Sequence, residues 1–292
     1  MVSEIKGKAF AKINLTLDIL SKLDNGYHLV KMIMQSIDLC DYITIKTNDT
    51  GKIVISSNEP CLPTDESNTA YKAAKLFFDN AGSCEKIGIN IHIEKHIPSL
   101  AGLGGGSADA AAVLVLLNTL FENPLNTAKL LSLGKKVGAD VPFCLLGGTM
   151  LAEGIGTDLC ALVSIPDCFI VLAKPDIGVS TKEAYTLCDK LERKTEDRTK
   201  KALLAIENND LTTLSGCLFN RFEEALKLEE VKSIRKLMSD FEALGSCMTG
   251  SGSAVFSIFD DEVKAKKCST ELRKYYKDVF ICRPYSFGVE II

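Results

Sequence analysis

The sequence predicts an α+β protein, in which strands and helices follow one another in partly separate blocks. Polar and apolar residues alternate over the first 60 residues, a strand-like segment at 87–97 leads through a glycine-rich turn into a helix, and helical patterns dominate from 199 to 243. With 292 residues the chain is long enough for two domains or one large one. Its 46% hydrophobic and 25% charged residues are typical of globular proteins.

Short alternating segments open the chain. Ile13, Leu15 and Leu17 share one face of a predicted strand, and residues 42–46 and 52–56 repeat the period of two. This pattern indicates antiparallel strands joined by hairpins. At 68–80 the apolar spacing becomes helical, and Gly82 ends the predicted helix.

The middle of the chain alternates again before it becomes helical. Residues 87–97 predict a strand that stops at Pro98, and the glycine-rich turn after it runs into an Ala/Leu/Val-rich helix at 107–120. A second helix is predicted at 126–137, followed by the segment GADVPF at 138–143. Beyond residue 198 we expect helices at 199–207, 209–226 and 229–243, then a strand, a helix and a strand at 253–259, 261–276 and 278–284.

Charge and cysteine content limit the classes of function. The 34 Lys and Arg residues against 38 Asp and Glu give a net charge of −4, which argues against a nucleic-acid or membrane partner. We see no secretory leader and no apolar run of the roughly 18 residues that a membrane-spanning helix needs. Eleven cysteines without a CxxC pair argue against a disulfide framework or a zinc ribbon. We therefore expect a cytoplasmic protein.

The glycine-rich turn is the strongest chemical signal. Gly102, Gly104, Gly105 and Gly106 stand between a strand and a helix, where amides without Cβ obstruction and a helix N-terminus favour a phosphate group. A plain tight turn is the alternative. No Lys follows the glycines as in a Walker A loop, and Ser107 takes the third glycine position of a dinucleotide-binding fingerprint.

Residues 98–108, PSLAGLGGGSA, resemble the PxxxGLGxSSA pattern of the GHMP kinases, named for galactose, homoserine, mevalonate and phosphomevalonate. The segments AFAKINL at 9–15 and MTGSGSA at 248–254 are similar to two further motifs of that family, in the same order. NGYH at 25–28 and GADVPF resemble the branch that acts on 4-diphosphocytidyl-2-C-methyl-D-erythritol.

The resemblance implies a two-domain fold. We expect an N-terminal ATP-binding domain at 1–160, with a mixed sheet covered by helices, and a smaller C-terminal α/β sandwich at 161–292. The cleft between them would hold the active site. ATP and Mg²⁺ are the implied cofactors, a small cytidyl diphosphate is the implied substrate, and the implied assembly is a monomer or a weak homodimer.

The resemblance also implies roles for single residues. Lys12 and Asp140 would form the catalytic pair, with Asp140 accepting the proton of the acceptor hydroxyl and Lys12 stabilising the charge that develops. The residues implied in ATP binding are Asn68, Lys95, Pro98, Ser99, Leu100, Ala101, Gly102, Leu103, Gly104, Gly105, Gly106, Ser107 and Ala108. The residues implied in substrate binding are Asn14, Tyr27, His28, Thr181 and Tyr185.

The implied function is ATP-dependent phosphorylation of the 2-hydroxyl of 4-diphosphocytidyl-2-C-methyl-D-erythritol, in non-mevalonate isoprenoid synthesis. A GHMP kinase for homoserine or mevalonate is one alternative, against which NGYH and GADVPF argue. A catalytically silent nucleotide-binding regulator is another, against which the presence of both Lys12 and Asp140 argues. The Mg²⁺ ligands stay open, because Ser107 has no unambiguous carboxylate partner and the helix dipole also explains Asp109.

Overall fold

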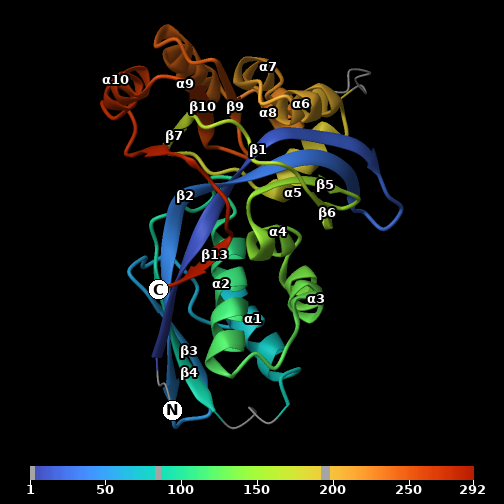
Figure 1. The fold of residues 1–292 in the computed structure, drawn as a ribbon, viewed down its shortest axis with the longest axis vertical. Helices are drawn as coiled ribbons and strands as arrows, with labels where there is room; N and C mark the ends of the chain where they lie inside the picture. Colours follow the sequence, from blue (N-terminus) through green and yellow to red (C-terminus); the bar gives the residue numbers. More distant parts are fainter. Residues whose placement is uncertain (1–3, 83–86, 192–197) are drawn as a thin grey trace.

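A long antiparallel hairpin, made of β1 (Glu4–Lys22) and β2 (His28–Asn48), runs through most of the molecule (Figure 1). The computed structural model describes residues 4–82, 87–191 and 198–292. We expected several short strands here, and the structure corrects that expectation. The register between β1 and β2 shifts at three places, and each shift changes the phase of the alternation without ending the strand.

The hairpin belongs to a mixed sheet of the first domain. Its main path is β13-β1-β2-β4-β3, in which β3 and β4 are parallel and the other neighbours are antiparallel. β5 pairs with β2 and with β6, while β8 and β12 add short pairings to β1 and β2. The additional strands are β3 (Ile53–Ser57), β4 (Gly88–Glu94), β5 (Thr149–Glu153), β6 (Asp158–Ala161), β8 (Phe219–Asn220), β12 (Pro284–Tyr285) and β13 (Val289–Ile291).

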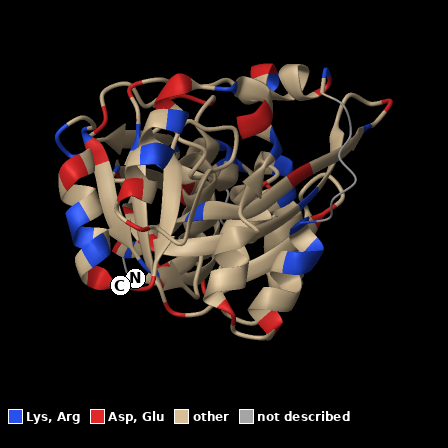
Figure 2. Ribbon diagram, turned by 90° about the horizontal axis from the view of Figure 1, so that it is seen from above, with Lys and Arg blue, Asp and Glu red and all other residues tan. Residues whose placement is uncertain are grey.

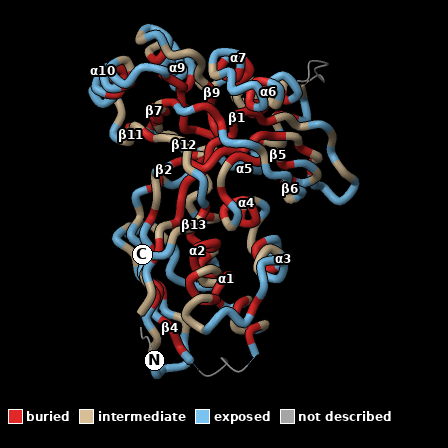
Figure 3. The backbone as a smooth tube through the Cα atoms, viewed as in Figure 1, coloured by how far each residue is buried: buried red, intermediate tan, exposed pale blue. Residues whose placement is uncertain are grey.

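One helix forms the centre of this domain. α2 (Gly105–Leu120) packs against β1 and α1, and its small side chains at Ala108, Ala110 and Ala111 are fully buried, which allows close approach. The burial view shows α2 mostly buried between the sheet and the neighbouring helices (Figure 3). Those neighbours are α1 (Thr69–Phe78), α3 (Thr127–Val137) and α4 (Val141–Leu146).

The second domain is built on a four-stranded antiparallel sheet of order β11-β7-β10-β9. α9 packs on β9 and β10, and α10 packs on β7 and β11. The strands are β7 (Phe169–Lys174), β9 (Gly245–Met248), β10 (Val255–Phe259) and β11 (Asp278–Cys282). The helices are α5 (Thr181–Cys188), α6 (Arg198–Glu207), α7 (Leu211–Gly216), α8 (Arg221–Leu226), α9 (Glu229–Asp240) and α10 (Glu262–Leu272).

The helix expected at 209–226 is wrong in one respect, because the structure divides it. Asp210 caps α7, Asn220 caps α8, and β8 between them pairs in parallel with β1. Tertiary pairing therefore overrides the helical periodicity at this point. The α+β fold with two domains is confirmed.

Basic and acidic residues are interspersed along the outer helices (Figure 2). None of the helices within the described ranges is both long and apolar enough to cross a bilayer. β6 is the last strand of the first sheet before β7 opens the second, whereas β8, β12 and β13 return to the first sheet. The division at residue 160 stays a prediction.

Candidate active site

The glycine-rich loop ends in the first turn of α2. Gly104 is the N-cap residue in the left-handed region, with φ 73°, and its carbonyl accepts the first helical bond from the amide of Ala108 at 2.9 Å. The amides of the first turn have no acceptor within a helix. Gly106 is exposed, while Gly105 and Ser107 are half-buried, so these amides lie at the surface where an anion can reach them.

Two segments hold this loop in place. The amide of Lys12 donates to Leu103 O at 3.0 Å, and the amide of Ala254 donates to Ala101 O at 3.1 Å. The loop is thus clamped between β1 and the turn at 249–254. All three sequence motifs of the family resemblance therefore meet at one place.

The side chain of Lys12 crosses the loop and reaches Asp140. A methyl group on Gly104 would lie 3.0 Å from Lys12 Cγ, so glycine leaves the path that the lysine follows. Lys12 Nζ lies 2.8 Å from Asn14 Oδ1 and 3.4 Å from Asp140 Oδ2. The lysine side chain is almost fully buried, whereas 31% of the Asp140 side chain is exposed. An ammonium thus faces a carboxylate that a second molecule can still reach.

Asp140 is held by the start of α4. It occupies the N-cap position, and Pro142 stands in the first turn. Among the described residues, no helix amide bonds to its carboxylate, so local capping does not use these oxygens. Local sequence alone would suggest a capping acid, but the structure directs the carboxylate toward Lys12.

Asn14 lies beside Lys12, yet it is buried. Only 1% of it is exposed, and its Oδ1 accepts both Lys12 Nζ and the amide of Gly250, the latter at 3.0 Å. The backbone amide of Asn14 donates to Thr249 Oγ1 at 3.0 Å. The side-chain oxygen of Asn14 is therefore bonded within the protein, and its contact with substrate stays a prediction.

His28 and Tyr185 form an aromatic pair. The His28 and Tyr185 rings stack with centroids 4.4 Å apart and an interplanar angle of 17°. Burial raises the pKa of Tyr185 to about 12, and the charge of Asp140 adds to that shift. The negative charge of Asp140 therefore acts on the Tyr185 hydroxyl. Tyr27 is 61% exposed in the preceding turn.

Sequence reasoning missed Asp189 and Ser251. Asp189 Oδ1 lies 2.7 Å from His28 Nε2, and its other oxygen lies 2.5 Å from Lys22 Nζ. Ser251 belongs to the segment MTGSGSA at 248–254, which we call the third glycine motif. Its Oγ lies 3.0 Å from Thr181 Oγ1, so this motif contacts the start of α5. Neither contact had a signal in the sequence, because both join distant segments.

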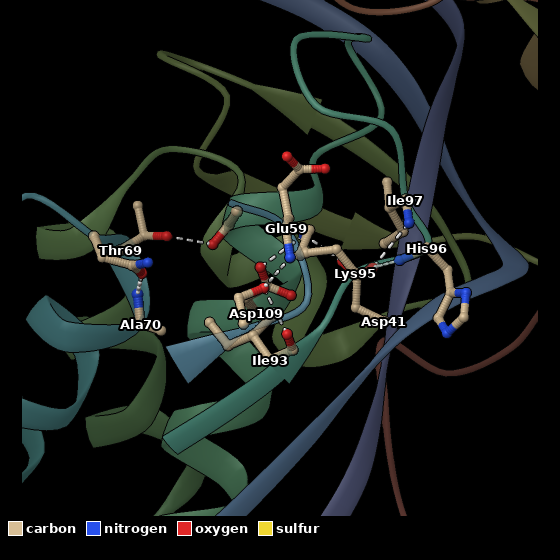
Figure 4. Close-up of polar contacts among 12 residues, drawn as sticks. Asp41, Glu59, Thr69, Ala70, Ile93, Lys95, His96, Ile97 and Asp109 are labelled. Atoms are coloured by element: carbon tan, nitrogen blue, oxygen red, sulfur yellow. Dashed lines mark hydrogen bonds and ion pairs between the residues drawn. The ribbon is translucent and has the colours of Figure 1, made fainter. Parts of the chain in front are cut away.

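The side chain of Lys95 reaches Asp41 and Asp109 (Figure 4). Its ammonium contacts Asp41 and, at 2.8 Å, Asp109 Oδ2, and the lysine side chain is only 7% exposed. Burial lowers the pKa of Lys95, but the charges of Asp109 and Asp41 outweigh burial and raise it overall. A methyl group on Gly105 would lie 3.2 Å from Lys95 Nζ. The lysine therefore lies against the loop from the protein side, and its contact with ATP stays a prediction.

Asn68 is also engaged within the protein. Its side-chain oxygen caps α1 by accepting the amide of Ala70 at 2.8 Å, and its Nδ2 donates to Pro63 O at 2.6 Å. The next residue, Thr69, donates its hydroxyl to Gly106 O at 2.7 Å. The start of α1 is thus tied to the first turn of α2.

The described part of the chain holds no group of three or more His, Cys, Asp and Glu side chains arranged for a metal ion. Mg²⁺ bound with nucleotide phosphates needs only one or two carboxylates from the protein. Ser107 Oγ lies close to Gly138, where a methyl group would be 4.0 Å from it. A hydroxyl at the start of α2 fits a supporting ligand of a phosphate-bound Mg²⁺.

The comparisons with known proteins agree with this geometry. Residues 68–148 match the GHMP kinases N terminal domain, and residues 189–278 match the GHMP kinases C terminal domain. A protein of Clostridium botulinum named 4-diphosphocytidyl-2-C-methyl-D-erythritol kinase is 45% identical over 94% of this chain and 98% of its own.

Solved structures give the same result at the level of the fold. A crystal structure of 4-(cytidine 5'-diphospho)-2C-methyl-D-erythritol kinase superposes with a TM-score of 0.80 at 29% identity, over 95% of this chain and 98% of its own. A homoserine kinase from Cytophaga hutchinsonii superposes with a TM-score of 0.81 at 22% identity, over 100% of this chain and 98% of its own. The second likeness shows only the shared fold.

Proposed function

The chain belongs to the GHMP kinases and, within them, to the 4-diphosphocytidyl-2-C-methyl-D-erythritol kinase family, and on that premise we propose that it phosphorylates the 2-hydroxyl of 4-diphosphocytidyl-2-C-methyl-D-erythritol with ATP. The observation that carries the proposal is the pair Lys12 and Asp140, which lies beside the glycine loop. The relatives' substrate makes homoserine and mevalonate the less favoured acceptors.

Phosphoryl transfer needs an in-line hydroxyl, an acceptor for its proton and positive charge at the moving group. The exposed part of the Asp140 carboxylate hydrogen-bonds the substrate hydroxyl and takes its proton as the oxygen attacks the γ-phosphorus of ATP. A new O–P bond forms, the bond to the leaving ADP oxygen breaks, and Lys12 stabilises the charge between them. The bridge through Asn14 keeps Lys12 turned toward this point.

The triphosphate of ATP lies along residues 98–108, where exposed amides of the first turn of α2 donate to its oxygens. Asn68 and Lys95 contribute from the protein side: Asn68 fixes the start of α1, and Lys95 supports Gly105 from below. Mg²⁺, when bound, neutralises phosphate charge and aligns the γ-phosphoryl group. Ser107, at the start of α2, would offer its hydroxyl to the ion beside the phosphate oxygens.

The cytidine end of the substrate lies against the aromatic pair. Tyr185 and the exposed Tyr27 offer faces on which a base stacks, at roughly 1–3 kcal/mol by analogy with single-stranded nucleic acids. Asp189 holds the ring of His28, which leaves its other nitrogen to read the base edge. Thr181, whose hydroxyl lies 3.0 Å from that of Ser251, would bind the substrate diphosphate.

We expect the Asp140→Asn variant to lose turnover by about 10²–10⁴-fold, because the amide cannot take the hydroxyl proton. ADP release is measured with the cytidyl substrate, homoserine and mevalonate, and the exposed Asp79→Asn variant is the matched control. Wild-type turnover in Asp140→Asn would remove this residue from the role of base. If ADP is released faster with homoserine or mevalonate than with the cytidyl substrate, the proposed substrate is wrong. ATP binding without turnover on any of the three compounds would favour a catalytically silent nucleotide-binding regulator.

A further inference from the structure

The first turn of α8 holds the backbone of the third glycine motif. Asn220 Nδ2 donates to Met248 O at 2.7 Å and to Gly250 O at 2.8 Å. Three residues further on, Glu223 Oε2 accepts the amide of Met248 at 2.8 Å. Asn220 is only 2% exposed, so these bonds form away from water. Two side chains of one helical turn thus hold three backbone groups of this motif, the N–H and C=O of Met248 and the C=O of Gly250.

The orientation of the Asn220 amide follows from its partners. Its Oδ1 accepts the amide of Phe222 at 2.9 Å, which caps α8. Carbonyl oxygens only accept and backbone N–H groups only donate, so a flipped amide would oppose every one of these contacts. The same side chain therefore has two separable functions: its oxygen caps a helix, and its nitrogen holds the glycine motif.

The backbone held by Asn220 leads directly to the catalytic lysine. The amide of Gly250 donates to Asn14 Oδ1 at 3.0 Å, and this oxygen also accepts Lys12 Nζ at 2.8 Å. Asn220 itself is anchored to the same strand as Lys12, because β8 pairs in parallel with β1 at Thr16 and Leu17. A continuous series of contacts therefore runs from Asn220 through Gly250 and Asn14 to Lys12.

A glycine-rich turn needs such external support. Gly250 and Gly252 have φ values of 53° and 88°, and a turn without side chains has many conformations of similar energy. When the Asn220 nitrogen is removed, the donor shared by the carbonyls of Met248 and Gly250 is lost. The amide of Gly250 then has no fixed direction toward Asn14, and Lys12 loses part of its positioning.

We propose that Asn220 is a positioning residue for phosphoryl transfer, which acts on Lys12 through Gly250 and Asn14 and does not touch the substrates. The inference rests on the proposed kinase function for its rate measurements. It adds a role for a residue of the second domain that no sequence motif of the active site contains.

Asn220→Ser and Asn220→Asp both keep an oxygen that caps α8 but lack the amide nitrogen. We expect kcat per folded molecule to fall by about 10- to 100-fold, with the KM for ATP changed by less than about threefold, because a small misplacement of a catalytic group reduces the rate. The matched controls are Asn126→Ser and Asn126→Asp. Asn126 caps α3 through the amide of Lys129 at 2.9 Å and is exposed, so these controls should keep wild-type kcat.

A double-variant cycle with Lys12→Met tests the route. If Asn220 acts through Lys12, Asn220→Ser costs little further rate in the Lys12→Met background. The same factor in both backgrounds would overturn the proposal, and so would wild-type kcat in both Asn220 variants.

Hydrogen exchange at the Gly250 amide gives a readout that needs no turnover: we expect faster exchange in the Asn220 variants than in the Asn126 controls, and equal exchange would contradict the proposal. A wild-type chain without kinase activity would instead refute the proposed function, and the exchange result would still decide the positioning.

Discussion

Three charged side chains, those of Lys95, Asp41 and Asp109, are buried next to the glycine-rich loop. If both carboxylates are ionised, their two negative charges exceed the single positive charge of Lys95. Asp41 accepts the amides of His96 and Ile97 as well as the ammonium of Lys95. Asp109 Oδ1, by contrast, is buried and finds no hydrogen-bond partner in the part of the chain that the structure describes. Burial raises the pKa of Asp109 to about 8. We therefore expect a proton on Asp109 near neutral pH, so that the cluster adds no net negative charge beside the glycine-rich loop.

This shift makes the stability depend on pH. Between the ordinary pKa of 3.8 and the folded value of about 8, the folded chain holds a proton on Asp109 that the unfolded chain releases. The stabilisation of the folded state by this proton is complete below pH 3.8 and is lost as the pH rises to about 8. The free energy of unfolding of wild type relative to Asp109→Asn should fall from pH 5 to pH 8, by at most about 1.4 kcal/mol per pH unit, and then level off. Urea unfolding at several pH values measures it.

Asp210→Asn serves as the control, because folding lowers the pKa of Asp210 but raises the pKa of Asp109. A hydrogen bond from the Thr213 side chain lowers the pKa of Asp210, so its contribution is lost only as the solution becomes acidic. The difference between wild type and Asp210→Asn should stay constant from pH 5 to pH 9. A difference between wild type and Asp109→Asn that is equally constant over this range would show that Asp109 does not hold the proton.

At the scale of elements, the glycine loop and the third glycine motif fit together by backbone contact. A methyl group on Gly102 would lie 2.1 Å from Thr249 O, and one on Gly250 would lie 2.7 Å from Gly102 O. Gly102 also has φ 76°, a conformation that disfavours a side chain. The two motifs need glycine at this junction because no side chain fits between them.

Gly102→Ala should therefore disturb both motifs. We expect the free energy of unfolding to fall by at least about 2 kcal/mol, from backbone strain and displacement together, and kcat/KM for ATP to fall by about tenfold or more. Gly82→Ala measures the backbone strain alone, without a steric clash. Gly82 has φ 74°, and a methyl group there meets no atom within 4 Å among the described residues, so we expect a loss of about 1 kcal/mol and unchanged kinetics. Equal effects of both substitutions would mean that the contact with Thr249 is unimportant.

Elements with local signals were predictable from the sequence. The strand at 88–94 and the helix at 105–120 follow from clear periodicity and from the glycines between them. The division of 209–226 was not predictable, because β8 exists only through its pairing with β1. The contact between Lys12 and Asp140 likewise depends on α4 packing against β1, which no spacing in the sequence reveals. The family resemblance suggested the pair, and the geometry now supplies the reason for it.

At the scale of the whole molecule, the end of the chain completes the first sheet. β13 pairs with β1 at Gly7, Lys8 and Ala9, and β12 pairs with β2 at Ser36 and Ile37. The amide of Phe10 donates to Gly288 O at 3.0 Å. Residues that follow the strands of the second sheet in sequence therefore lie against the strand that carries Lys12.

The first domain should therefore depend on the last nine residues for its stability. A chain that ends at Arg283 lacks β12 and β13, and we expect its free energy of unfolding to fall by at least about 2 kcal/mol, because several buried backbone bonds to β1 and β2 are lost. Hydrogen exchange should accelerate first in β1 and β2 and less in β7 and β10, which belong to the other sheet. A chain that ends at Ile291 keeps both strands and serves as the control. If the chain that ends at Arg283 matches this control in stability and exchange, residues 1–160 form an independent unit, and the sheet does not need its C-terminal strands.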